Sequence, residues 1–143
     1  MEGKLNYTGY VYADTLTGNI IHGCKGQTIY SEVAAVKRSM LHSYELRNLV
    51  RDEWLERNGH GKLNLERDKS KEALKEVEHL KYDDPSRSIV QNHYYSVNTA
   101  RAKAFRDMSR SDEKTLRKEL TGKGGRFKIM KVKCIELSDP EEE

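Results

Sequence analysis

The chain has 143 residues, a length that suits one domain with its own core. Hydrophobic residues make up 36% and charged residues 34%, and no apolar run approaches the roughly 20 residues of a membrane-spanning helix, so a membrane protein is not expected. The only cysteines, Cys24 and Cys134, lack the spacing of a zinc site and are expected to be reduced thiols. We therefore expect a soluble, cytoplasmic protein without a metal or cofactor.

The first thirty residues predict a β-meander. Residues 7–12 (YTGYVY) are rich in strand-forming side chains, and residues 14–19 supply turn chemistry. Residues 20–24 predict a second strand. Residues 27–30 predict a short third strand, which follows a two-residue hairpin loop at Lys25-Gly26.

Amphipathic helices are expected after the meander. Ser31 is a suitable N-cap, and apolar residues recur at helical spacing as far as Trp54, which predicts one helix over about 31–57. Pro85 is expected to end the next helix, and Ser111 to cap the last. These later helices are predicted over residues 68–82, 88–109 and 112–120.

Residues 126–137 (RFKIMKVKCIEL) predict the last strand. Their apolar positions change phase after Ile129, which predicts either a bulge or a sheet covered on both faces. The strand is expected to join the meander, giving an α+β fold: one antiparallel sheet with a long helical insertion of three to four helices over about 31–121. Residues 1–137 would then form a single domain, and residues 138–143 an acidic disordered tail.

Two segments resemble small accessory proteins of tailed bacteriophages. The first is Gly26–Lys37 (GQTIYSEVAAVK), where a hairpin leads into a helix, and the second is Phe127–Val132 (FKIMKV). The resemblance covers about 30 of the 143 residues and is interrupted by a helical insertion over 41–122. It implies a phage-encoded protein that acts on a component of the bacterial host, and it carries over no catalytic residues.

Charge is segregated along the chain. Residues 86–133 hold thirteen Lys and Arg against four Asp and Glu, a net charge of +9, whereas residues 134–143 hold five acids and no base. A coherent positive surface can bind acidic proteins, nucleotides or nucleic acid, although a solvated helix face and edge-strand lysines explain the same pattern. The candidate binding residues are two tyrosines that offer stacking surfaces and seven cations: Tyr94, Tyr95, Arg101, Lys103, Arg106, Arg110, Arg117, Lys123 and Arg126.

No pattern of catalytic residues emerges. Cys24 has only His22 near it, two residues away on a predicted strand and so on the same face. We therefore predict a non-enzymatic binding protein: a phage-encoded inhibitor or sequestering protein that binds a host (defence) protein or a nucleotide-like ligand, and that forms a homo-oligomer. The alternatives are a nucleic-acid-binding protein that uses the basic 86–133 region, and a small nuclease or phosphodiesterase.

Overall fold

The computed structural model describes residues 6–135. It divides into two compact units: unit 1 joins the chain up to Asn48 with the chain from Lys118 onward, and unit 2 is Leu49–Arg117. The predicted acidic tail, residues 138–143, lies outside the described residues. The single domain over 1–137 stays a prediction.

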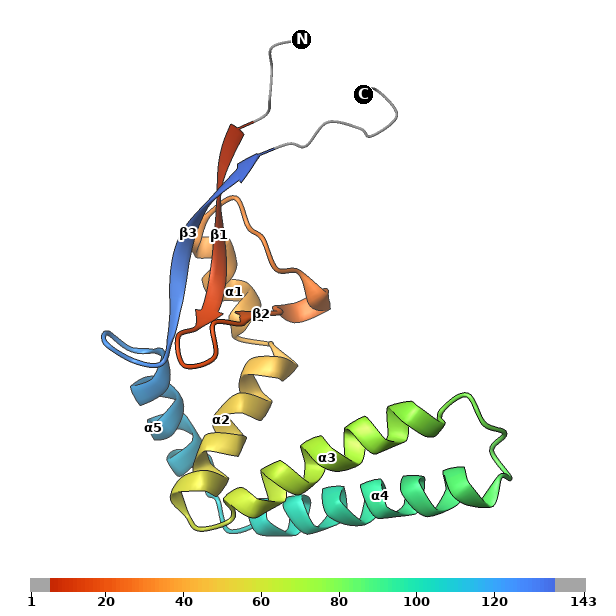
Figure 1. The fold of residues 1–143 in the computed structure, drawn as a ribbon. Coiled ribbons are helices and arrows are strands. Elements are labelled where there is room, and N and C mark those ends of the chain that lie inside the picture. Colours follow the sequence, from red (N-terminus) through yellow and green to blue (C-terminus); the bar gives the residue numbers. More distant parts are fainter. Residues whose placement is uncertain (1–5, 136–143) are drawn as a thin grey trace, which may run out of the picture. The chain divides into compact units, whose positions relative to one another are not determined.

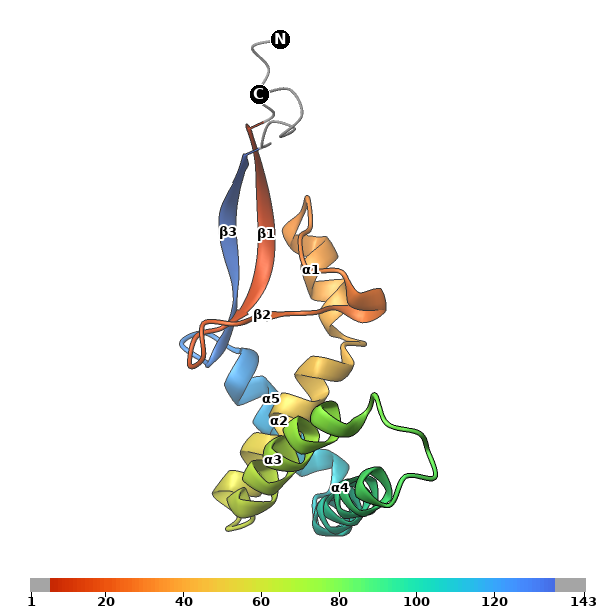
Figure 2. The same ribbon diagram turned by 45° about the vertical axis from the view of Figure 1, so that its right-hand side comes forward.

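Unit 1 contains a three-stranded antiparallel sheet (Figures 1 and 2). The central strand, β1 (Asn6–Asp14), pairs with the two-residue β2 (Ile20–Ile21) on one side and with β3 (Phe127–Ile135) on the other. The predicted α+β fold, with the N-terminal strands and the C-terminal strand in one antiparallel sheet and a helical insertion between them, is confirmed.

The meander is shorter than predicted. The second strand ends at Ile21, and the third is reduced to one bridge between Tyr10 and Tyr30. A 3-10 turn, η1 (Cys24–Gly26), replaces the hairpin loop, with positive φ angles of 63° and 76° at Lys25 and Gly26. At Gly23, just after β2, an added Cβ would stand 2.0 Å from the hydroxyls of both Ser39 and Tyr30. The backbone passes so close to these side chains that only glycine fits there.

The change of phase in the apolar pattern of the last strand does not correspond to a β-bulge. The pairing of β1 with β3 runs without a break from Asn6↔Ile135 to Asp14↔Phe127. On the face opposite Phe127, Val11 of β1 is buried, but its neighbour Met130 of β3 is 41% exposed. The prediction of a bulge is therefore wrong. The face of the sheet opposite Phe127 is covered at Val11 of β1 but only partly covered at Met130 of β3.

The predicted helix over 31–57 is two helices, α1 (Val33–Met40) and α2 (Tyr44–Arg57). Ser43 breaks it, because its hydroxyl accepts a hydrogen bond from the Leu46 amide at 3.1 Å and donates one to the His22 carbonyl at 2.5 Å. Glu32, not Ser31, is the N-cap of α1, without a side-chain cap bond. The insertion therefore holds five α-helices in place of the predicted three to four.

Replacing Ser43 by Ala is expected to lower the free energy of unfolding by about 1–2 kcal/mol, because α2 loses its N-terminal hydroxyl and the His22 carbonyl loses a donor. Chemical denaturation followed by circular dichroism measures the change. The matched control is Ser31→Ala, at the exposed serine that the sequence predicted as a cap, which should change stability by less than about 0.5 kcal/mol. Equal effects of the two substitutions would contradict this assignment.

In unit 2, α3 (Gly61–Val77) and α4 (Pro85–Phe105) pack side by side as a helical hairpin (Figure 1). The next helix, α5 (Arg110–Thr121), begins in unit 2, and its residues from Lys118 onward belong to unit 1. The prediction that Pro85 ends a helix is wrong: α3 ends at Val77, and Pro85 begins α4, because the Asp84 side chain accepts from the Ser86 amide and proline suits the first helical turn. Ser109, not Ser111, caps α5 by accepting from the Asp112 amide at 3.1 Å. Within residues 6–135, no helix is both long and apolar enough to cross a membrane.

Candidate binding surface

The nine predicted binding residues fall in both units. Seven of them, from Tyr94 to Arg117, belong to unit 2, whereas Lys123 and Arg126 belong to unit 1. The predicted basic region 86–133 is therefore divided between the two units.

Arg101 faces the interior of unit 2. Its guanidinium donates to the carboxylate of Asp52, which also accepts from Arg67 at 2.8 and 2.9 Å. The Arg101 side chain is only 12% exposed and lies 5.4 Å from the centre of the Phe105 ring. Burial and the nearby charge of Arg67 lower the pKa of Arg101, and Asp52 acts against this shift. Arg101 is thus part of a structural group, Asp52, Arg67 and Arg101, which we call the Asp52 cluster.

Arg126 is likewise bound within unit 1. Its guanidinium donates two parallel hydrogen bonds to Asp14, from Nε to Oδ1 at 2.8 Å and from Nη2 to Oδ2 at 2.7 Å. The Asp14 side chain is 2% exposed and also accepts from the Leu16 amide at 3.0 Å. A buried, bidentate ion pair of this kind holds β1 to the start of β3, so Arg126 is not a surface cation.

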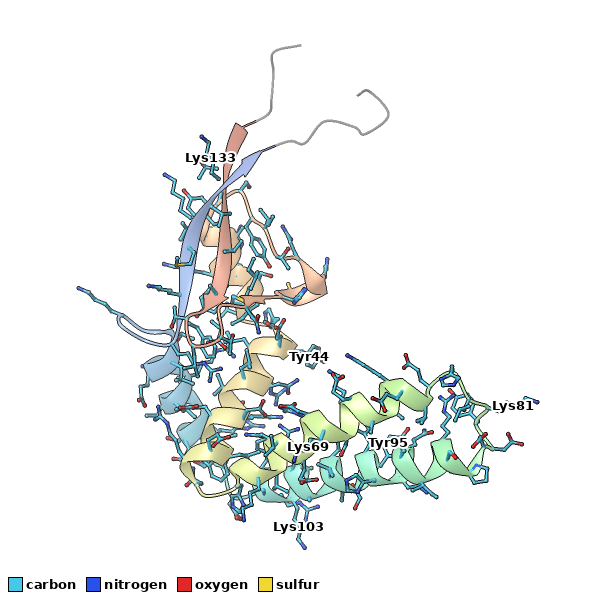
Figure 3. All side chains as sticks on the ribbon, viewed as in Figure 1. Tyr44, Lys69, Lys81, Tyr95, Lys103 and Lys133 are labelled. Carbon is cyan, nitrogen blue, oxygen red and sulfur yellow. The ribbon has the colours of Figure 1, made fainter. Side chains whose placement is uncertain are left out.

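The remaining predicted residues of unit 2 do not form a strongly basic surface. Lys103, Arg106 and Arg110 are exposed (Figure 3 labels Lys103), but Asp107 and Asp112 are exposed between and beside them in the sequence. Arg117 and Tyr94 are half-buried. Tyr95 is 55% exposed, and its hydroxyl accepts from Gln91 at 2.8 Å. The band of positive charge predicted along the third helix is therefore weakened by its own acids and by the inward turn of Arg101.

The strongest unbalanced charge lies on β3 and the turn before it. Between Leu120 and Lys133 the chain has no acidic residue. Lys123 and three lysines of β3 are exposed, and none of them makes an ion pair with another described residue. We call the three lysines of β3 the edge lysines: Lys128, Lys131 and Lys133, the last of which is labelled in Figure 3.

The edge lysines belong to the predicted basic region but not to the nine chosen residues. The sequence contains a signal for them, because lysines interleaved with apolar residues in a predicted strand, without acids, indicate one exposed margin of a sheet. In the strand order β2-β1-β3, β3 lies at the edge of the described sheet.

The candidate nucleophile has different neighbours from those predicted. His22 and Cys24 do not share a strand face, because β2 ends at Ile21 and Cys24 begins η1. The imidazole Nδ1 of His22 lies 2.7 Å from the Glu45 carboxylate, and the Cys24 thiol lies 3.5 Å from the Ser39 hydroxyl. Among residues 6–135, no group of three or more His, Cys, Asp and Glu side chains is arranged to hold a metal ion.

Neither protein-family models, nor curated protein sequences, nor solved structures give a match to this chain. The resemblance to phage accessory proteins therefore stays a prediction.

Proposed function

We propose that the protein is a non-enzymatic binding protein whose edge lysines dock on an acidic surface of a protein partner. The observation that carries the proposal is the exposure of these three lysines on one strand, in a stretch of chain without acids. The resemblance to phage accessory proteins supports a role as a phage-encoded inhibitor or sequestering protein that acts on a host protein in the bacterial cytoplasm.

The chemistry of β3 suits a macromolecular partner. Met130 is 41% exposed and Val132 is half-buried, and both share a face of the sheet with Lys128, whereas Lys131 and Lys133 lie on the other face. Exposed cations attract an acidic partner over a distance and set its orientation, whereas apolar contacts exclude water and slow dissociation. Both kinds of contact are present on the same strand.

Nucleic acid and nucleotide-like ligands are the rival partners, because lysines also bind phosphate. The features that favoured them are reduced in the structure: Arg101 and Arg126 are bound to carboxylates, and Tyr94 is half-buried. A polymeric nucleic acid is distinguished by a binding constant that falls log-linearly with salt, with a slope near −0.9 per phosphate contacted.

The test reverses the charge of the edge lysines together, as Lys128→Glu, Lys131→Glu and Lys133→Glu. A partner captured from bacterial lysate and identified by mass spectrometry is purified, and its affinity is measured by calorimetry. We expect affinity to fall about 100-fold, since each reversed surface charge costs about 1 kcal/mol.

The matched control reverses three exposed lysines of α3, as Lys62→Glu, Lys69→Glu and Lys71→Glu, and should leave affinity within about threefold. The net charge changes equally in both variants, so a difference between them reports the place of the charge. Equal losses, or no loss in the β3 variant, would overturn the proposal. Retention of a nucleotide by the purified protein in native mass spectrometry would favour the small-ligand reading instead.

A further inference from the structure

The outer margin of β3 offers main-chain hydrogen-bonding groups as well as charge. We propose that the partner binds there by adding a strand to the sheet, and that this strand alternates acidic with apolar residues. The inference rests on the proposed function and specifies how the same surface is used.

The direction of each peptide group in β3 follows from two sets of hydrogen bonds. The Arg126 carbonyl accepts from the Thr15 amide at 2.9 Å, and hydrogen-bonded positions alternate along an antiparallel ladder. Lys128, Met130 and Val132 therefore direct their N–H and C=O groups toward β1. Tyr10 of β1 shows the same alternation. Its N–H donates to the Tyr30 carbonyl at 2.8 Å and its carbonyl accepts from the Tyr30 amide at 2.9 Å, so the peptide groups of Tyr10 point away from β3.

The alternate residues of β3, namely Ile129, Lys131 and Lys133, consequently direct their N–H and C=O groups away from β1. No strand within residues 6–135 pairs with this side of β3, and Figures 1 and 2 both show β3 at the margin of the sheet. Three successive outward residues, in a strand of 9 residues, form a template on which an extended peptide can continue the sheet.

The side chains of β3 define the chemistry of the added strand. Lys131 and Lys133 lie on one face of the sheet, and Met130 and Val132 on the other, because side chains alternate along a strand. A neighbouring strand places its own residues beside these pairs. Acidic residues beside Lys131 and Lys133, and apolar residues beside Met130 and Val132, satisfy both faces over residues 130–133.

A second copy of the chain fits this margin poorly. Full antiparallel overlap of two β3 strands is centred on residue 131, so Lys131 would lie directly opposite the Lys131 of the other copy. Like charges directly opposite one another destabilise a strand pair. In this register the charge of β3 therefore opposes self-pairing and favours an acidic partner strand.

The probe for this proposal is a nine-residue peptide of alternating Glu and Val, the length of β3. Amide hydrogen exchange is followed by NMR. In the free protein, the amides of Met130 and Val132 should exchange slowly, and those of Ile129, Lys131 and Lys133 fast. Saturating peptide should slow the three outward amides at least tenfold. A peptide of nine Glu residues and a Glu-Val peptide with N-methylated amides should not.

A protein variant tests the same geometry. Lys131→Pro removes an outward N–H that β1 does not use, so the sheet should persist while binding of the Glu-Val peptide is lost. Lys131→Thr, which keeps the N–H but removes the charge, should weaken binding by no more than about fivefold. Circular dichroism shows whether Lys131→Pro folds. If it does not, the N-methylated peptide decides the outcome.

Three results would overturn strand addition: no binding of the Glu-Val peptide, binding without slower exchange of the outward amides, or equal binding of the N-methylated peptide. Binding of a DNA oligonucleotide, with steep salt dependence and no protection of these amides, would place the lysines in nucleic-acid recognition instead. If charge reversal on β3 lowers the affinity for the captured partner but the outward amides stay unprotected, only the proposed mode of binding is wrong. If charge reversal has no effect, the proposed function itself fails.

Discussion

Replacing Asp52 by Asn is expected to lower the free energy of unfolding of unit 2 by about 3–5 kcal/mol. Asp52 is the carboxylate that both arginines of the Asp52 cluster share, and all three side chains are at most 21% exposed. Without its charge, Arg67 and Arg101 would remain close together and largely desolvated, with the exposed Asp68 beside Arg67 offsetting a part of their charge. Removing one member of a buried ion pair costs more than the pair itself contributes, because the remaining charge is left uncompensated.

Urea denaturation monitored by circular dichroism measures this loss. The matched control is Asp68→Asn, which removes the same charge from a side chain that is 64% exposed and also bonded to Arg67. It should cost less than about 1 kcal/mol. A second variant, Asp52→Asn combined with Arg101→Met, should recover part of the loss, because one of the two uncompensated cations is then gone. Similar costs for the two aspartates would show that the Asp52 cluster contributes little.

The sequence predicts the sheet better than it predicts the helices around it. The strands of unit 1 carry local signals, and the last strand joins the N-terminal strands in one sheet as predicted, although it pairs with β1 over nine residues without the bulge that its apolar pattern allowed. The break between α1 and α2 depends instead on the bond from Ser43 to the carbonyl of His22, which lies 21 residues earlier. A helical periodicity that continues through Ser43 gives no sign of this contact.

Charge alone could not separate the surface cations from the structural ones. Arg101 and Arg126 look like members of a basic band, but their carboxylate partners, Asp52 and Asp14, lie 49 and 112 residues away. The edge lysines have no such partner among the described residues. Their alternation with apolar residues was visible in the sequence, but the outward direction of the peptide groups at Ile129, Lys131 and Lys133 depends on the register with β1.

Replacing Asp14 by Asn should destabilise unit 1 by about 3–5 kcal/mol, for the same reason as at Asp52. The substitution keeps the shape of the side chain but removes the charge that two guanidinium nitrogens of Arg126 face. Because the pair joins the end of β1 to the start of β3, exchange of the β3 amides toward β1 should also become faster. The matched control, Glu32→Gln, removes an exposed carboxylate at the N-terminus of α1 that makes no side-chain cap bond, and should cost less than about 1 kcal/mol.

The ion pair between Asp14 and Arg126 makes the free energy of unfolding depend on pH. Burial alone would raise the pKa of Asp14, but hydrogen bonds from Arg126 and the Leu16 amide, with the charge of Arg126, together hold it below the ordinary value of 3.8. The folded state therefore binds this proton less readily than the unfolded state. The resulting stability is present above pH 3.8 and is lost as the pH falls through the lower pKa of the folded state. Denaturation measured from neutral pH down to acid should thus show a steeper loss in the natural protein than in Asp14→Asn. Parallel curves for the two proteins would mean that the charge of Asp14 does not contribute to the stability of unit 1, and that the main-chain pairing of β1 with β3 and side-chain packing suffice.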